Sequence, residues 1–526
     1  MKTITLAVFI FAVLHINAQN TFFRTYGDIN KEEGKSLSLC SDGGFIIGAD
    51  ITLIPPSSDS SNMLLVRTNA DGDTLWTRII NSGENDFCVK VAEISDLGFI
   101  VLANRVDVAG NSKIMLIKLD ASGVIQWKKT FFWGGSGVTG YSFIEKLGGG
   151  YLICGAKTYA DGLLINTNAL GDTLWTKYYN AFPSLSLYQP FHDVKQLADS
   201  TFVILGAHYN INIFEPRMFR MDGLGNIMYE KQYNANLDDG ITLSLANMQE
   251  SNGFVFAGNS RTNEWNRFIV KVDSLFNIEW QQKYSLSTVN VISSIVQMQD
   301  SGFVFVAGPN NPISDHSLMI KTNNTGAVSW TKEFEYASFH TPMGEFHNVG
   351  YKNLVLTGDN GIAFCGFFLD TISNNNKDLV LVKTNANGNI PCDGINVVVL
   401  NSAITYFPDN TIYNTTRGTL LGNSTLTIQS GIQTSNLCFS TSAANNSFEK
   451  EDDFLIFPNP VTNELTIGNP EFKIAMIEFY NVMGKKCLSL NSQPSTINVS
   501  SLTFGIYFLR VTDEKGNKIS KKIVKM

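Results

Sequence analysis

The chain has 526 residues, of which only 16% are charged, and its formal net charge is -8 at pH 7. The charged fraction lies well below the roughly 25% of an average globular protein. No block of Lys and Arg interleaves with aromatic residues, and this pattern excludes an extended nucleic-acid-binding surface.

The first residues, 1–18, have the pattern of a signal peptide. One Lys precedes an apolar run from Ile4 to Leu14, and a small-residue pattern ends at Ala18 before Gln19. The run is too short to span a bilayer, so we expect export with cleavage between Ala18 and Gln19. No later stretch approaches about twenty uninterrupted apolar residues, which predicts a mature chain without a membrane-spanning segment.

From residue 19 to residue 392 the chain repeats one pattern seven times, at a period near fifty residues. Each unit contains an apolar run such as FIIGA from Phe45 or FIVLA from Phe99, typical of a strand buried on both faces. A strand, a polar turn and a second strand follow. Turn pairs such as Asn387-Gly388 indicate hairpins, because these residues tolerate positive φ.

Four strands per unit without helical periodicity predict an all-β fold, a seven-bladed β-propeller. An aromatic residue closes the hairpin in six units, and Pro391 stands at that place in the seventh. We expect each ring to pack between adjacent blades. The six residues are Trp76, Trp127, Trp175, Tyr229, Trp280 and Trp330.

The seventh unit lacks the short strand that follows the aromatic residue in the other six. A segment of the same character, FFRTYG, stands at the other end of the chain, from Phe22 to Gly27. We therefore predict that the N-terminal strand completes the seventh blade and closes the ring.

Several motifs resemble sites but are better explained by the repeat. Residues 135–140 satisfy GxGxxG, yet the following segment, YSFIEK, reads as a strand, whereas a dinucleotide site needs a helix there. His340, Glu345 and His347 could hold a metal only if their long loop folds back, and a solvated insertion is the simpler interpretation. We therefore predict no catalytic residue, cofactor site or metal site.

Two insertions are nevertheless the places where a ligand would be sought first. The larger contains SFHTPMGEFHNVG in the seventh unit, and the second lies near Phe182 to Phe191. Loops carried by a rigid ring commonly hold function.

Residues 393–451 are dense in Ser, Thr and Asn, with three charged residues between Asp393 and Ser447. Most of this segment reads as a spacer. Pieces such as INVVVL and STLTIQS alternate as strands do, so the segment either packs on the propeller or forms a small β element of its own.

The seven cysteines include no CxxC pair, and their number is odd. Cys154 and Cys365 occupy matching places in two apolar strands, which predicts that they fill the core. Cys392 and Cys438 flank the same irregular segment and are the one candidate disulfide.

Residues 452–526 read as a small β-sandwich of short alternating strands with Gly-containing turns. They resemble the type A C-terminal sorting domain of the type IX secretion system of Bacteroidetes. The matching positions are the turn Pro458-Asn459-Pro460, the hairpin residue Gly484, the strand residues Gly505-Ile506-Tyr507 and the terminal basic pair Lys521-Lys522.

This resemblance implies passage across the inner membrane and then through the type IX machinery, followed by removal of the domain by a sortase-like protease. The product would be secreted or held at the cell surface. The alternative is an accessory immunoglobulin-like domain without a sorting role.

These features favour an exported propeller that binds an extracellular glycan or protein. Two alternatives stay open: a polysaccharide-degrading enzyme, either a glycoside hydrolase or a lyase, and a purely structural adhesin. Fold alone does not separate them. Carboxylates converging at the channel mouth would favour the enzyme.

Overall fold

The computed structural model describes residues 20–27, 30–53, 61–132, 137–157, 161–180, 190–210, 213–235, 244–246, 253–260, 266–285, 290–309, 316–335, 337–338, 353–370, 376–390, 400–402, 406–409, 414–417, 420–421, 427–429, 433–440, 455–457, 461–468, 474–481, 486–490, 496–513 and 518–525. These residues form strands and turns without a helix. The chain divides into two compact units, Met1–Ser442 and Ala443–Met526.

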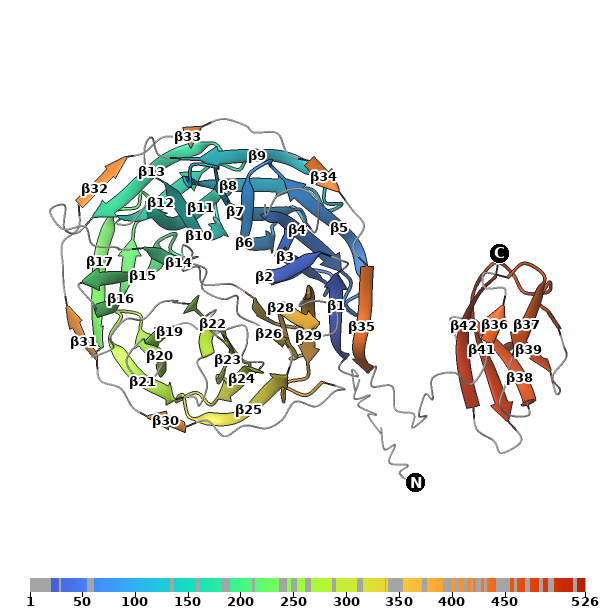
Figure 1. Cartoon of the computed structure of the whole chain (residues 1–526). Coiled ribbons are helices and arrows are strands. Elements are labelled where there is room, and N and C mark those ends of the chain that lie inside the picture. Colours follow the sequence, from blue (N-terminus) through green and yellow to red (C-terminus); the bar gives the residue numbers. More distant parts are fainter. Residues whose placement is uncertain are drawn as a thin grey trace, which may run out of the picture. The chain divides into compact units, whose positions relative to one another are not determined.

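Unit 1 is a ring of seven antiparallel sheets, or blades, in the described part of the chain (Figure 1). Six blades follow one another along the sequence, each running outward from the centre of the ring. Their first four strands are β2 (Lys31–Leu39), β3 (Phe45–Thr52), β4 (Ser61–Thr68) and β5 (Thr74–Asn81) in blade I; β6 (Asn85–Glu93), β7 (Phe99–Val106), β8 (Ser112–Leu119) and β9 (Ile125–Phe131) in blade II; β10 (Val138–Glu145), β11 (Tyr151–Lys157), β12 (Asp161–Thr167) and β13 (Thr173–Asn180) in blade III; β14 (Phe191–Gln196), β15 (Phe202–Asn210), β16 (Ile213–Met221) and β17 (Ile227–Ala235) in blade IV; β18 (Ser244–Leu245), β19 (Gly253–Ser260), β20 (Asn266–Asp273) and β21 (Ile278–Ser285) in blade V; and β22 (Asn290–Gln297), β23 (Phe303–Pro309), β24 (His316–Thr322) and β25 (Val328–Glu335) in blade VI.

Blade VII is assembled from both ends of the repeat region. Its C-terminal part comprises β26 (Ala337–Ser338), β27 (Leu354–Leu356), β28 (Ile362–Asp370) and β29 (Asn376–Thr384). Strand β1 (Thr21–Gly27) pairs with β29 in antiparallel register, with Phe22 opposite Lys383 and Tyr26 opposite Leu379. The predicted closure by the N-terminal strand is therefore confirmed.

The apolar runs form the second strand of each blade and are buried on both faces, as predicted. Strand β3 is fully buried from Phe45 to Ala49, and β7 is buried from Phe99 to Asn104. Cys154 in β11 and Cys365 in β28 are wholly inaccessible to solvent, which confirms that they fill the core. Cys392 lies outside the described residues.

A single turn design follows the third strand of every blade. In blade I the side-chain oxygen of Asn69 accepts hydrogen bonds from the N–H of Asp71 at 3.0 Å and of Asp73 at 2.8 Å, and Gly72 has φ of 77°. The N–H of Gly72 donates to the carbonyl oxygen of Asn69 at 3.1 Å, and β4 and β5 pair antiparallel on either side, which confirms the predicted hairpin. The residues equivalent to Asn69 are Asp120, Asn168, Asp222, Asp273, Asn323 and Asn385.

The repeated aromatic rings pack on the turn of the next blade. The indole N–H of Trp76 donates to the carbonyl oxygen of Ala121 at 3.1 Å, and the ring meets Phe99 edge-on at 5.6 Å. Its six-membered ring covers Gly123, where an added Cβ would lie 3.0 Å away. All six rings are half-buried, so truncating one should cost less than the roughly 3 to 5 kcal/mol of a fully buried ring.

The seventh ring of the series is Phe22, supplied by β1. A Cβ added to Gly72 of blade I would lie 2.8 Å from the Phe22 ring, as Trp76 approaches Gly123 one blade further on. The Tyr26 hydroxyl then donates to the carbonyl oxygen of Gly72 at 2.7 Å, and Tyr179 makes the same bond to Gly225 at 2.6 Å. The closing strand thus reproduces the contact between blades.

A second turn joins the first and second strands of a blade, and in the six blades where the structure describes it, blades I to IV, VI and VII, it too contains a left-handed residue. Glycine fills the place at Gly43, but Leu97 holds φ of 65° in blade II with its side chain 55% exposed. Holding a non-glycine residue in the left-handed region costs about 1–2 kcal/mol. Replacing it with glycine removes this strain, but glycine also loses more conformational entropy on folding, which offsets part of the gain in stability.

We therefore expect Leu97→Gly to raise the free energy of unfolding by about 0.5–1 kcal/mol. Urea denaturation of the two proteins measures this difference. The control is Val108→Gly. Val108 is exposed and does not have a left-handed backbone conformation, so this substitution relieves no strain. A loss of stability in Leu97→Gly would show that the Leu side chain contributes more than the strain costs.

Buried charges join blade I to blade VII at the seam where the ring closes. The Lys35 ammonium lies 2.9 Å from Glu33 and 3.4 Å from Asp50, and Lys377 of β29 pairs with the other oxygen of Glu33. Burial raises the pKa of Asp50 to about 6, although Lys35 and the N–H of Cys88 oppose it. Burial also acts on Glu33, but its two lysine partners outweigh it and lower the pKa to about 2.

These opposite shifts predict opposite effects of pH on stability. The pKa of Asp50 in the folded protein exceeds its unfolded value of 3.8, so protonated Asp50 favours the folded state. This contribution to stability is fully present below about pH 4 and is lost as pH rises through about 6. Between pH 4 and pH 7 we expect the free energy of unfolding of the parent protein to fall by an amount on the order of 2 kcal/mol because of Asp50, and Asp50→Asn should remove this fall. Urea midpoints of both proteins between pH 4 and 7 test this, and parallel profiles would contradict it.

Strands from residues 400–440 lie on the outer edges of the blades, the first of the two arrangements that the sequence left open. After blade VII the chain runs back round the ring in the reverse order of the blades (Figure 1). Short strands pair antiparallel with the fourth strands of blades V, IV, III, II and I in turn: β30 (Leu400–Ser402), β31 (Tyr406–Asp409), β32 (Asn414–Arg417), β33 (Leu420–Leu421) and β34 (Thr427–Gln429).

The last strand of this segment, β35 (Gln433–Ser440), pairs with β1 of blade VII. We call β30 to β35 the belt. Open strand edges invite pairing with other chains, and covering them removes that hazard. In the residues that the structure describes, β25 of blade VI has no belt strand beside it.

Unit 2 contains two antiparallel sheets around one apolar core in its described residues. The core includes Ile477, Phe479, Leu509 and Ile523, all inaccessible to solvent. One sheet comprises β36 (Leu455–Phe457), β37 (Glu464–Gly468) and β40 (Ile497–Asn498); the other comprises β39 (Lys486–Leu490), β38 (Ile474–Asn481), β41 (Gly505–Asp513) and β42 (Lys518–Lys525). The all-β fold class, a propeller followed by a small β domain, is confirmed.

Candidate functional site: the central channel

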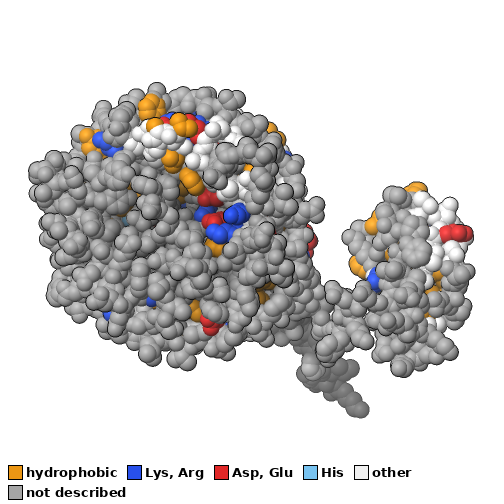
Figure 2. All heavy atoms as spheres, viewed as in Figure 1, with side chains coloured by type: hydrophobic (Ala, Val, Ile, Leu, Met, Phe, Trp, Pro, Cys, Tyr) orange, Lys and Arg blue, Asp and Glu red, His pale blue; other side chains and the backbone are white. Residues whose placement is uncertain are grey.

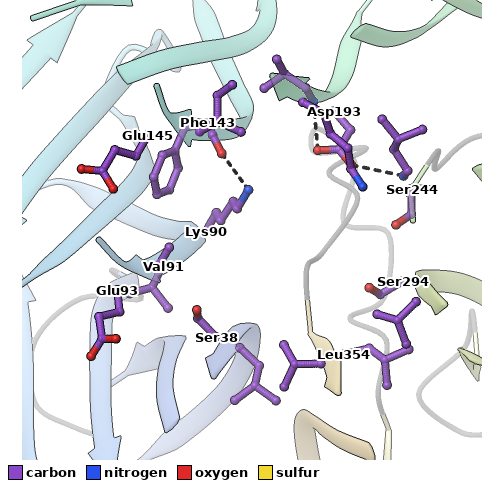
Figure 3. A pocket seen from close by; sticks show the side chains of 18 of the residues that line it. Ser38, Lys90, Val91, Glu93, Phe143, Glu145, Asp193, Ser244, Ser294 and Leu354 are labelled. Atoms are coloured by element: carbon purple, nitrogen blue, oxygen red, sulfur yellow. Dashed lines mark hydrogen bonds between the residues drawn. The ribbon is translucent and has the colours of Figure 1, made fainter. Parts of the chain in front are cut away.

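The first strands of the blades surround a cavity of about 350 Å³ at the centre of the ring (Figure 3). Every described blade contributes to its wall, from Ser38 of β2 to Leu354 of β27. In the space-filling view, basic and acidic side chains gather near the centre of the visible face (Figure 2). The cavity therefore combines charged groups with apolar wall.

Irregularities in the inner strands set which side chains face this cavity. The register of β6 shifts between Cys88 and Lys90, that of β14 between Phe191 and Asp193, and that of β22 between Ile292 and Ser294. Such bulges re-aim the following side chains. Lys90, Asp193 and Ser294, the residues that follow the shifts, all line the cavity.

Two inner strands, β6 and β14, are each bridged to the next blade by a lysine. The Lys90 ammonium donates to the carbonyl oxygen of Phe143 at 2.7 Å and lies 5.1 Å from the centre of the Phe143 ring (Figure 3). Lys195 of blade IV donates to the carbonyl oxygen of Ala246 in blade V. These charge-assisted bonds hold neighbouring walls at fixed positions.

Asp193 is buried and bridges the same two blades. One carboxylate oxygen accepts the N–H of Leu245 at 3.1 Å, and the other accepts the N–H of Val194 at 3.0 Å. A buried carboxylate needs such donors. Its hydrogen bonds thus fix the wall between β14 and β18.

The other carboxylates of the wall hold turns of the preceding blade. Glu93 accepts the N–H of Ser41 at 2.7 Å, and Glu145 accepts the N–H of Ser95 at 2.9 Å. Figure 3 shows both carboxylates directed away from the cavity. In blade III the amide oxygen of Gln196 accepts the N–H of Leu147 at 2.7 Å in the same way.

This arrangement suits recognition better than acid–base chemistry. Glycosidic bond cleavage uses two carboxylates that flank one bond across a cavity. The carboxylates of Glu93 and Glu145 instead face the backbone turns of the preceding blades. The cavity instead presents a rigid wall of ammonium groups, serines such as Ser38 and Ser294, and apolar side chains. Its volume lies at the lower end of small-ligand sites, which span about 300–1,000 Å³.

The sequence-predicted positions do not meet in this cavity. The six repeated aromatic residues lie on outer strands, and Phe191 from the second insertion is 2% exposed in β14. Ala18, Gln19, residues 182–189, His340, Glu345 and His347 lie outside the described residues. Among the residues that the structure does describe, no group of three or more His, Cys, Asp or Glu side chains is placed to hold a metal ion.

The sorting motif falls in unit 2 and partly outside the described residues. Gly505, Ile506 and Tyr507 begin β41, and the Tyr507 hydroxyl donates to the carbonyl oxygen of Thr503 at 3.0 Å. Lys521 and Lys522 belong to β42. The turn Pro458-Asn459-Pro460 and Gly484 lie outside the described ranges.

The channel residues could not be predicted from the sequence of a single unit, because nothing within one unit marks them. A signal does exist at the level of the repeat: Glu93, Glu145 and Gln196 recur about fifty residues apart, just before the turn of the inner hairpin. A long polar side chain repeated at that place indicates a bond between blades.

Comparison with known proteins identifies the C-terminal segment. Residues 455–526 match the family model of the secretion system C-terminal sorting domain. No curated protein matches the chain. In the described part of the chain, no helix has the length and apolar character needed to cross a membrane.

Several solved structures are similar to this chain at low sequence identity. A protein of unknown function from Dyadobacter fermentans is 9% identical, with 70% of this chain and 99% of that chain covered and a TM-score of 0.37. The extracellular domain of a putative one-component system from B. thetaiotaomicron is 11% identical, with 94% and 80% covered and a TM-score of 0.27. PorZ, a surface component of the type IX secretion system of Porphyromonas gingivalis, is 8% identical, with 96% and 100% covered and a TM-score of 0.17. TM-scores this low give no basis for inferring the fold or function of this chain from these structures.

Proposed function

From the premise that this chain is an extracellular or cell-surface protein exported by the type IX secretion system, we propose that its propeller is a binding module. The ligand is an extracellular glycan or protein segment that enters the mouth of the central channel. The type IX machinery handles the sorting domain, and we propose that the signal peptide at residues 1–18 and a sortase-like protease act before and after that step.

The observation that carries this proposal is the commitment of the channel carboxylates to structure. Glu93, Glu145 and Asp193 each accept backbone N–H groups that hold turns or neighbouring strands. These bonds aim the carboxylates at the protein's own backbone, whereas a group that transfers a proton must lie within hydrogen-bond reach of the substrate. A binding site gains from the same bonds, because a wall that is already rigid loses little entropy on association.

The alternative that a specific observation keeps open is a glycoside hydrolase or lyase. Charged groups do gather at the ring centre, and Lys90 points into the cavity (Figure 3). That reading requires catalytic groups from elsewhere on the face. The structural adhesin remains the reading in which the channel has no ligand.

Filling the channel tests the proposal. Ser38 lines the cavity and is half-buried, so Ser38→Trp should place a large ring inside it. Val108 is fully exposed on a turn of blade II, and Val108→Trp is the matched control.

Both variants and the parent protein are applied to glycan and peptide arrays, with circular dichroism and thermal unfolding as checks of folding. We expect the parent and Val108→Trp to retain the same ligands and Ser38→Trp to lose at least about tenfold in affinity, or about 1.4 kcal/mol. Equal retention by all three would place binding away from the channel. Absence of any retained ligand would leave the structural adhesin as the better account.

A further inference from the structure

We propose that the belt is a clamp on ring closure: strand β35 holds the N-terminal strand β1 in blade VII, and the seam between blades VII and I opens once β35 is released. The proposal concerns the stability of the ring and is independent of the ligand that the channel takes. It rests on how β1 is paired and on what β1 alone contributes to blade I.

Strand β1 lies between two strands that come from distant parts of the chain. On one side β29 pairs with β1 from Phe22 to Tyr26, and on the other β35 pairs with it from Thr21 to Gly27. Strand β35 of the belt therefore pairs along the whole length of β1, and its pairing extends one residue further at each end than the pairing of β29. A strand with both edges paired exchanges and detaches less readily than an edge strand.

The rest of the belt is much weaker. Strands β30 to β34 have two to four residues each, against eight in β35. Isolated pairings of this length contribute little, because each ordered residue costs about 1–2 kcal/mol of backbone entropy. The belt is thus anchored at its end, on the one strand that closes the ring.

Release of β1 removes three contacts that only it makes with blade I. Phe22 covers Gly72, the Tyr26 hydroxyl donates to the carbonyl oxygen of Gly72 at 2.7 Å, and Arg24 forms an ion pair with Asp73 at 2.5 Å. The other blades keep the equivalent contacts inside continuous chain. Loss of β35 should therefore loosen this seam and leave the other six unchanged.

Paired proline substitutions in the full chain test the clamp. Proline removes the backbone N–H and cannot support a ladder bond. Adjacent residues of a strand point their N–H groups to opposite edges, so one of Ser435 and Asn436 directs its N–H toward β1. Replacing both, Ser435→Pro with Asn436→Pro, therefore removes a hydrogen bond to β1 whichever of the two residues donates it. Thr415→Pro with Thr416→Pro makes the same change in β32 and is the matched control.

Hydrogen exchange at the amides of residues 21–27 is the measurement. We expect exchange to accelerate at least about tenfold in the β35 variant, in line with the net value of one or two hydrogen bonds, and to stay at the parent rate in the β32 variant. Unchanged exchange in the β35 variant, or equal acceleration in both variants, would overturn the proposal.

A reversible cross-link decides the question if the proline variant fails to fold. Thr25 stands opposite Ser435 in the ladder, so Thr25→Cys with Ser435→Cys places two thiols across β1 and β35. Cys487 is exposed and is replaced by Ser in this background. Lys283→Cys with Ser402→Cys, across β21 and β30, is the control for joining the belt elsewhere.

Oxidation of the first pair should slow exchange in β1 at least about tenfold, and reduction of the same sample should restore it. Oxidation of the control pair should leave β1 unchanged. If β1 exchanges at the same rate in both redox states of the Thr25–Ser435 variant, strand β35 is not the clamp.

Discussion

Replacing Gly225 with Phe should lower the free energy of unfolding by about 3 kcal/mol. Gly225 has φ of 75°, and a Cβ there would lie 2.7 Å from the Trp175 ring and 2.9 Å from the Tyr179 hydroxyl. The left-handed conformation costs a non-glycine residue about 1–2 kcal/mol, and overpacking adds about 1–3 kcal/mol. Thermal or urea unfolding measures the loss.

The neighbouring blade shows how the same position accepts a large side chain. In blade V the residue equivalent to Gly225 is Phe276, at φ of 65° and wholly buried, and the ring facing it is Tyr229, with 5.0 Å between the ring centres. A smaller aromatic residue on one blade thus accompanies a larger turn residue on the next. Trp with Gly and Tyr with Phe are two solutions to one packing problem.

The double variant Gly225→Phe with Trp175→Tyr should therefore recover at least about 1 kcal/mol of what Gly225→Phe loses, since contacting residues couple by about 0.5–3 kcal/mol. Trp175→Tyr alone serves as the control. If the two losses simply add, the exchange seen between blades IV and V is not a packing compensation.

Truncation of the chain after Ser442 should abolish its release from the cell. The sorting domain matches residues 455–526, and the division between the two compact units falls between Ser442 and Ala443. The truncated chain keeps the propeller and the whole belt, so we expect it to fold and accumulate in the periplasm. Immunoblots of periplasmic, outer-membrane and culture fractions measure the change.

Fusion of residues 443–526 to an unrelated exported protein provides the converse test. We expect the fusion to appear outside the cell in a strain with an intact type IX system and to stay in the periplasm of a strain that lacks it. Appearance of the truncated propeller outside the cell would contradict the assignment of export to the tail.

The ring could be predicted because its evidence is local and repeated. Buried strands such as the one beginning at Phe45, and turns such as the one at Gly72, carry their pattern within a few residues, and seven copies in phase leave little freedom for another fold. The strand at Phe22 was found by the same logic, as the piece missing from the seventh unit.

The belt could be predicted only in part: the alternation in STLTIQS indicated a strand, and β34 lies within it, but packing on the propeller was one of two open arrangements because the pairings are distant and short. Strand β32 contributes only residues 414–417 to blade III, and a run of four polar residues has no periodicity to recognise. Strand β35, with eight residues, is the longest strand of the belt. The role of Phe22 as the seventh ring was hidden for a related reason, since Pro391 occupies that place in the linear repeat.

The channel was beyond prediction for a geometrical reason. Lys90 and Asp193 come from blades II and IV, and the sequence holds no measure of which inner-strand residues face the centre until the bulges are known. The bonds that Glu93 and Glu145 accept from the preceding blade decide whether these carboxylates serve catalysis or structure. The sequence marks them only by the recurrence of a long polar side chain about every fifty residues, and this recurrence does not show which group each side chain meets.

The most direct test of the account is to follow retention and turnover together on the same polymers. Purified full-length protein is incubated with a panel of soluble polysaccharides and proteins, and bound ligand, new reducing or unsaturated ends and released peptides are measured over time. We predict retention of at least one polymer without product. Products accumulating beyond the molar amount of protein would show that the propeller is an enzyme and contradict its assignment as a binding module.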